Sequence, residues 1–144
     1  MPTALQDIVR RERTNLLQFT CESFPWTARD ETSALAQFLQ FASEERSALA
    51  PLVQYLSRQR EPVPYTGTYP MSFTALGFVS LEHLLPMLLD AHSRDVASLE
   101  SDLKHVNDQT PRQLAQNLLD TKRRHLDRLK ELAGAHPLKY STVR

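Results

Sequence analysis

Several ionisable side chains fall at positions where the helical repeat of apolar residues calls for an apolar one. His92, for example, lies between Leu89 and Val96. Burying an unpaired charge has a cost that is a large share of the stability of a whole domain. We therefore expect these side chains to meet one another, a metal ion or water. They are Glu12, Glu45, Glu82, His92, Lys122 and His125.

Four of these residues could be metal ligands if they share one layer of a helical bundle. Antiparallel neighbouring helices place two residues level when both are equally far from the connecting loop. His92 and His125 differ in their distance from the connecting loop by about two residues, or roughly 3 Å along the bundle axis. For Glu12 and Glu45 the difference in height along the axis is roughly 7.5 Å. Glu82 is roughly 18 Å out of level with His125, which makes it the weaker candidate from the third helix.

Two carboxylates and two imidazoles suit a single first-row divalent ion such as Fe, Mn or Zn. Lys122 allows a second interpretation, because carboxylates in one buried layer repel one another and an ammonium supplies the positive charge that a metal would supply. In a third interpretation the apolar stripes are misphased and the polar side chains reach water. The candidate ligands are Glu12, Glu45, His92 and His125.

Four predicted helices have to position these residues in one domain, residues 1–144. Thr3 and Gln6 have the spacing of a capping box at the first helix. Thr110, Pro111 and Gln113 form a start signal for the last helix. We expect the carboxy-terminal tail, 135–144, to be loosely ordered. The predicted helices span about 3–22, 28–60, 72–107 and 111–133.

The connection between the second and third helices is rich in proline. Residues 61–71 read EPVPYTGTYPM, with three prolines and a glycine. In extended polyproline geometry they reach roughly 34 Å, the length of a helix of over about twenty residues. The second and third helices can therefore run parallel, joined by a long crossover, in an all-α four-helix bundle.

This pattern resembles the ferritin-like superfamily, in its small rubrerythrin-like branch, over about residues 3–134. In that family the first and third helices each give a Glu, the second and fourth each give Glu-x-x-His, and together they bind two irons. Glu12 matches the first-helix position. Glu45 matches the second-helix Glu, in FASEERSALAPL, and His125 matches the fourth-helix His, in LLDTKRRHLDRL.

The sequence departs from the family at three of its ligand positions. Ala48 stands where the second-helix His is expected, and Lys122 where the fourth-helix Glu is expected. The third-helix position falls near Leu89 by level, with His92 one turn on, or at Glu82 by local sequence. The resemblance therefore implies a ferritin-like bundle with a degenerate interior site. Such a site lacks di-iron oxidase activity and retains a polar layer or at most one divalent metal ion.

Two other functional classes are open. The chain could be a non-catalytic helical module for protein interaction or oligomerisation with no metal; if it is an enzyme, the resemblance implies a metal-dependent oxidoreductase. The DinB-like metal-binding bundles use three histidines, including a His-x-x-x-His pair. That spacing does not occur among the five histidines, which are His83, His92, His105, His125 and His136.

Composition excludes further classes. The 144 residues carry 17 Lys and Arg and 17 Asp and Glu, so the formal net charge is zero. A dedicated nucleic-acid-binding protein normally has a basic excess, so we expect no nucleic-acid partner. Three glycines argue against a Gly-rich phosphate-binding loop, and a single cysteine, Cys21, excludes an internal disulfide.

Apolar patterning bears on location and assembly. The longest apolar run is interrupted by Ser80, Glu82 and His83, so we expect no membrane-spanning segment. The amino terminus, MPTALQDIVRRERT, has charges where a signal peptide needs an apolar stretch, which predicts a cytoplasmic protein. Residues 76–91 are apolar nearly all round, as in a helix that is central or covered by a partner. We expect a homodimer through the apolar faces of the third helix.

Overall fold

A computed structural model describes residues 3–23, 32–63, 69, 73 and 81–134. This part of the chain is helical and contains no strand, which confirms the predicted all-α class. None of its helices combines the length and apolar character that crossing a bilayer requires. The helices are α1 (Ala4–Arg13), α2 (Leu16–Ser23), α3 (Thr32–Arg58), α4 (Leu81–Leu103) and α5 (Gln109–Gly134).

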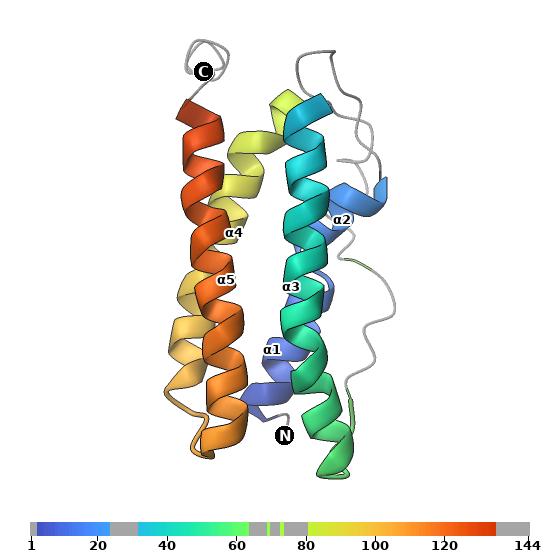
Figure 1. Cartoon of the computed structure of the whole chain (residues 1–144), viewed down its shortest axis with the longest axis vertical. Helices are drawn as coiled ribbons and strands as arrows, with labels where there is room; N and C mark the ends of the chain where they lie inside the picture. Colours follow the sequence, from blue (N-terminus) through green and yellow to red (C-terminus); the bar gives the residue numbers. More distant parts are fainter. Residues whose placement is uncertain (1–2, 24–31, 64–68, 70–72, 74–80, 135–144) are drawn as a thin grey trace.

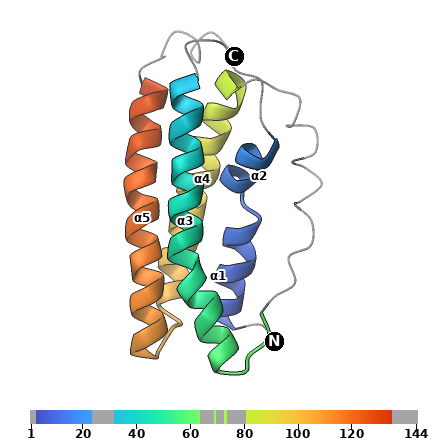
Figure 2. The same cartoon turned by 45° about the vertical axis from the view of Figure 1, so that its right-hand side comes forward.

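The three long helices lie side by side, and α1 and α2 together occupy the fourth position of the bundle (Figures 1 and 2). Both short helices pack against α3 and α4. The colours of Figure 1 show that α3 and α4 run in the same direction and that α5 runs the opposite way. This is the parallel arrangement that a long connection predicts. Much of the connection itself lies outside the described residues.

The prediction of one continuous first helix is wrong, because the chain breaks between α1 and α2. Thr14 leaves helical geometry, with φ −128° and ψ 26°. The backbone N–H of Gln18 then donates to the Asn15 side-chain oxygen at 3.0 Å. Asparagine is a favoured residue before a helix because it satisfies such a free N–H. A Thr-Asn pair thus ends one helix and begins the next.

The predicted capping box at the start of α1 is confirmed. The Thr3 N–H donates to Gln6 Oε1 at 2.8 Å, and the Gln6 N–H donates to Thr3 Oγ1 at 3.2 Å. The expected starts at residues 28 and 72, and the tail 135–144, lie outside the described residues.

The end of α3 at Arg58 comes two residues before the predicted end. Arg60 has a positive φ of 57°. The N–H of Glu61 donates to the Leu56 carbonyl at 2.9 Å, and the N–H of Arg60 donates to the Ser57 carbonyl at 3.1 Å. This pair of bonds is the Schellman motif, which satisfies the last carbonyls of a helix.

Both boundaries of the α4–α5 connection also differ from the prediction. Helix α4 ends at Leu103, and α5 begins at Gln109, two residues before Pro111. The Arg112 N–H donates to the Asp108 carbonyl at 3.1 Å, so the helix starts after Asp108 and Thr110 is not its cap. Pro111 still fits, because N–H groups in the first turn have no intrahelical partner.

The apolar core consists of two clusters with polar side chains between them. One cluster joins α1 to the later part of α3, and the other joins α2 to its earlier part. On α3, for example, Glu45 lies between Ala42 of one cluster and Leu49 of the other. We call five buried side chains the polar layer. They are Glu12, Glu45, His92, Lys122 and His125.

The apolar stretch at the start of α4 is largely covered by the chain itself. Leu84, Leu85 and Leu88 are buried in the second cluster, and Met87 is exposed. Burial inside the bundle therefore accounts for much of the apolar character of residues 83–91, whereas residues 76–80 of the same stretch lie outside the described part of the chain. The homodimer stays a prediction.

Candidate functional site

The polar layer is assembled from four helices at mid-height of the bundle. Lys122 is fully buried, and the other four side chains are each less than 5% exposed. The prediction that these ionisable groups face inward and meet is therefore confirmed, and the interpretation in which they reach water is wrong. Helix α1 gives Glu12, α3 gives Glu45, α4 gives His92, and α5 gives Lys122 and His125.

Lys122 binds carboxylates from two other helices. Its Nζ donates to Glu12 Oε1 at 2.6 Å and to Glu45 Oε1 at 3.1 Å. A third carboxylate oxygen, Oδ2 of Asp95, lies 3.9 Å from the same nitrogen. Burial by itself lowers the pKa of Lys122, but the three carboxylates outweigh it and raise the pKa above its ordinary value. The ammonium is therefore charged at all physiological pH values.

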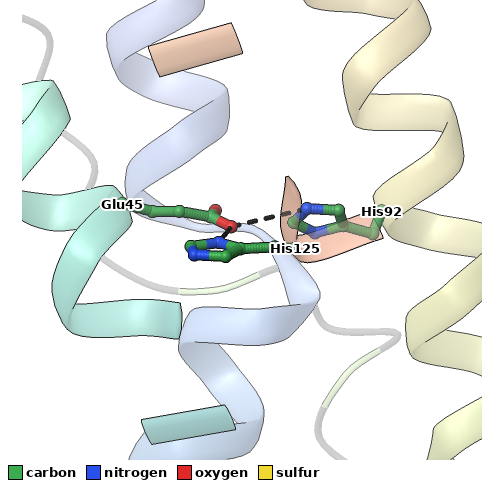
Figure 3. A group of neighbouring side chains, drawn as sticks. All are labelled: Glu45, His92 and His125. Atoms are coloured by element: carbon green, nitrogen blue, oxygen red, sulfur yellow. Dashed lines mark hydrogen bonds and ion pairs between the residues drawn. The ribbon is translucent and has the colours of Figure 1, made fainter. Parts of the chain in front are cut away.

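The Glu45 carboxylate is shared between the ammonium and two imidazoles. Its Oε1 accepts from Lys122, while its Oε2 lies 2.6 Å from His125 Nδ1 and 3.4 Å from His92 Nε2 (Figure 3). Burial raises the pKa of Glu45, but the Lys122 charge and the His125 hydrogen bond are together stronger and lower it to about 2. Glu45 is therefore ionised in the folded protein.

His92 is the neutral imidazole of the layer. Its Nε2 lies 3.2 Å from the backbone carbonyl oxygen of Lys122 and 3.4 Å from Glu45 Oε2. Because both neighbours are acceptors, this nitrogen carries the proton. Burial and the nearby Lys122 charge lower the pKa of His92 to about 4.

His125 lies between two carboxylates of α3. Its Nδ1 is 2.6 Å from Glu45 Oε2, and its Nε2 is 2.9 Å from Oε1 of Glu44, which is partly exposed. Each ring nitrogen therefore has a carboxylate oxygen within hydrogen-bond distance, which can accept its proton. Phe41 stacks on the ring with centroids 4.4 Å apart and planes at 22°. The pKa of Glu44 is lowered, first of all by the hydrogen bond from His125.

Three of the four candidate ligands converge closely enough to hold a metal ion. One ligand atom from each of Glu45, His92 and His125 lies within 4.8 Å of the other two. The three side chains come from α3, α4 and α5 and point at one another (Figure 3). Glu12 is not part of this group, and its carboxylate contacts Lys122 at 2.6 Å.

Helix α4 also places Asp95 at the edge of the polar layer, a residue that the sequence analysis missed. Burial, and then the negative charge of Glu12, raise the pKa of Asp95 to about 7 against the opposing effect of Lys122. The spacing in the sequence could have identified it, because Asp95 follows His92 by three residues and the two therefore share a helix face. Leu89, the position selected by level, packs instead against the apolar clusters.

Two further positions that the ferritin-like resemblance singled out are Ala48 and Glu82. Ala48 packs against the first apolar cluster, so the second-helix histidine position is part of the core. Glu82 belongs to α4, but its side chain lies outside the described residues.

The break between α1 and α2 supplies further contacts to the layer. Asn15, which begins α2, donates from Nδ2 to Glu12 Oε1 at 3.5 Å. The Arg11 Nε lies 3.4 Å from Glu12 Oε2, and its Nη1 lies 2.8 Å from Asp102 Oδ2. Glu12 therefore has cationic or amide donors on both oxygens.

Two surface pockets approach the layer. One of about 570 Å³ lies at the helix break and is lined by Arg11, Asn15 and Asp95 among others. The second, of about 450 Å³, is lined by Glu12 and by residues of α1, α2 and α3. Acidic side chains of the layer or its edge thus line both pockets.

Comparison with models of known protein families, with curated proteins and with solved structures gave no match for this chain. The ferritin-like resemblance therefore stays a prediction from the motifs.

Proposed function

We propose that the protein binds one divalent transition-metal ion through Glu45, His92 and His125, and that Lys122 replaces a second ion. In this proposal the chain is a ferritin-like bundle with a degenerate site and without di-iron oxidase activity. The observation that carries it is the convergence of three ligand atoms within 4.8 Å, from three helices, beside a buried ammonium.

The protonation states support this assignment. Metal ligands have to be deprotonated carboxylates and neutral imidazoles. The pKa of Glu45 near 2 and that of His92 near 4 provide both forms at neutral pH. His92 binds through Nε2 once its proton moves to Nδ1. His125 binds through Nδ1 in the tautomer whose proton is on Nε2.

The position of Lys122 supports a single ion. Its Nζ lies among oxygens of Glu12, Glu45 and Asp95, which is the environment of a cation. A metal ion beside it would share Glu45 with the ammonium, Oε1 facing the lysine and Oε2 facing the histidines. The pair of ions that di-iron chemistry requires has no room there while the lysine is present.

The donor set narrows the choice of metal. Two imidazoles and one carboxylate occur in Zn sites and in non-haem Fe(II) sites that keep open positions. Among Mn, Fe and Zn, such a site binds Zn most strongly by the general order of divalent affinities. Bound metal would supply Lewis acidity or, for iron, redox chemistry, while the chain provides orientation and a water-poor surrounding.

Metal analysis tests the proposal. Protein purified without chelator, and then dialysed against Zn²⁺, is compared with Glu45→Gln and His92→Ala variants. Glu131→Gln is the matched control, because Glu131 is exposed on α5. We expect about one ion per chain in the wild type and control. Loss of the ion is expected in both site variants. A wild-type chain that binds neither its own metal nor added Zn²⁺ would refute the proposal.

The second candidate is a non-catalytic interaction or oligomerisation module whose polar layer only fixes the packing. It is favoured by the short 2.6 Å contacts of Lys122 with Glu12 and of His125 with Glu45, which satisfy these charges without an ion. Under this alternative, chelator and Zn²⁺ leave the melting temperature unchanged. A metal-binding chain is stabilised by Zn²⁺, since a ligand that prefers the folded state raises its stability.

A further inference from the structure

Glu44 is the neighbour of a layer residue, but it lies at the protein surface. Its side chain is 41% exposed, whereas that of Glu45 is 3% exposed. Even so, Glu44 Oε1 accepts from His125 Nε2 at 2.9 Å, across the α3–α5 contact. Two consecutive residues of α3 therefore bind the two nitrogens of one imidazole ring on α5.

Helix α3 also holds Glu44 and the ring in place. Gln40 donates from Nε2 to Glu44 Oε2 at 2.9 Å, one turn earlier on the same helix. Phe41, from the same turn, stacks on the His125 ring. The orientation of the ring is thus fixed at both nitrogens and on one face, by side chains that all belong to residues 40–45.

We infer that Glu44 is a positioning residue for the metal site, holding the proton on His125 Nε2 so that Nδ1 faces Glu45 and His92 as a ligand. This inference rests on the proposed function. Of the two ring nitrogens of His125, Nδ1 is the one that faces the other two ligands, at 2.6 Å from Glu45 Oε2. The other nitrogen contacts the exposed carboxylate.

The chemistry of metal-bound histidine gives the reason. An imidazole that ligates through one nitrogen usually donates its other N–H to a carboxylate or carbonyl, which fixes the tautomer and increases the basicity of the ligating nitrogen. Removing such a partner typically lowers metal affinity about 10- to 100-fold. Within the described part of the chain, the Nε2 of His92 faces a backbone carbonyl and the buried Glu45 rather than a surface carboxylate. Glu44 therefore acts on one ligand.

If the Glu44–His125 contact served only packing, its loss would lower the stability of the metal-free protein and leave metal affinity unchanged. The Glu44 side chain is 41% exposed, and ion pairs open to solvent contribute little to stability, so we expect Glu44→Ala to keep the metal-free protein folded with nearly the same melting temperature. Metal affinity and the spectrum of the bound ion report instead on the geometry of His125. These two readouts separate a positioning role from a packing role.

The test compares wild type, Glu44→Ala, Glu44→Gln and the control Glu131→Ala, another exposed glutamate that pairs with Arg128 on its own helix. Zn²⁺ affinity is measured by competition with a chromophoric chelator at one pH, and Co²⁺ absorption reports the ligand field. We expect Glu44→Ala to bind Zn²⁺ about 10- to 100-fold more weakly, and Glu44→Gln to lie between it and wild type. The control keeps wild-type affinity.

The outcomes distinguish this inference from the proposed function. If wild type binds neither Zn²⁺ nor Co²⁺, the metal site itself is refuted. If wild type binds both and Glu44→Ala binds with the same affinity and Co²⁺ spectrum, the site stands and the role of Glu44 is refuted. Weaker binding with an altered Co²⁺ spectrum and an unchanged melting temperature of the metal-free variant supports the inference.

Discussion

Replacing Lys122 with methionine should destabilise the protein strongly at neutral pH. Methionine keeps most of the length of the side chain but removes the ammonium, which leaves Glu12 and Glu45 buried without their principal cation. Breaking a buried ion pair by removing one partner costs about 3–5 kcal/mol. Against a total stability of about 5–15 kcal/mol, that loss is severe.

The pKa of Glu45 gives an independent magnitude. Its partners lower the pKa from 4.5 to about 2 despite burial, which corresponds to about 3 kcal/mol of stabilisation of the ionised form. A lowered pKa contributes stability that is present above about pH 4.5 and is lost as the pH falls towards 2. Without Lys122 the largest effect that lowers the pKa of Glu45 is lost, so we expect burial to outweigh the remaining effects and to raise this pKa above its ordinary value. The folded state then binds a proton more readily than the unfolded chain, so stability falls as the pH rises.

Urea unfolding followed by circular dichroism, at pH 5 and pH 7, measures both effects. Lys130→Met is the matched control, because Lys130 is exposed on the same helix. We expect Lys122→Met to be less stable than the control by about 3–5 kcal/mol at pH 7, and to recover part of that loss at pH 5. Equal stability of the two variants, or no gain for Lys122→Met at pH 5, would refute the reasoning.

Three further predictions concern the same layer. Asn15→Ala should cost about 1 kcal/mol in urea unfolding, because it removes the side chain that begins α2; an unchanged midpoint would contradict this. Asp95→Asn should flatten the fall in stability between about pH 4 and pH 7. The raised pKa of Asp95, about 7, makes wild-type stability decline as the pH rises, by on the order of 1 kcal/mol per pH unit, and parallel pH profiles would exclude this. Lys122→Glu restores Glu-x-x-His on α5, so metal analysis should find more than one ion per chain, and a single ion would count against Lys122 as a substitute for metal.

The periodicity of apolar residues predicted the interior positions of the layer well. Glu12, Glu45, His92 and His125 interrupt apolar stripes, and all four are buried. A helix places every third or fourth residue on one face, so a polar residue on that face is visible in the sequence. The all-α class and the parallel direction of α3 and α4 follow from the same pattern and from the long connection.

Other features depended on contacts that periodicity does not encode. Asp95 lies at the edge of its stripe and is 17% exposed, so only its reach towards Lys122 brings it to the layer. Glu44 is exposed and joins the site through the ring of His125. The helix break at Asn15 depends on a local hydrogen bond that competes with the helix.

The contacts of Glu45 with an ammonium and with two imidazoles show how a lysine can stand beside the proposed metal site. Carboxylates that bridge two metal ions use one oxygen for each ion. Here Oε1 faces the Lys122 ammonium and Oε2 faces the two imidazoles. The ammonium is tethered to the chain, so its charge is present at any metal concentration and the carboxylates stay paired when no ion is bound. Under the proposed function, the same tether occupies the second metal position. A layer of this kind would therefore keep its carboxylates paired without metal, and the proposed site would support only the chemistry of a single ion at Glu45, His92 and His125.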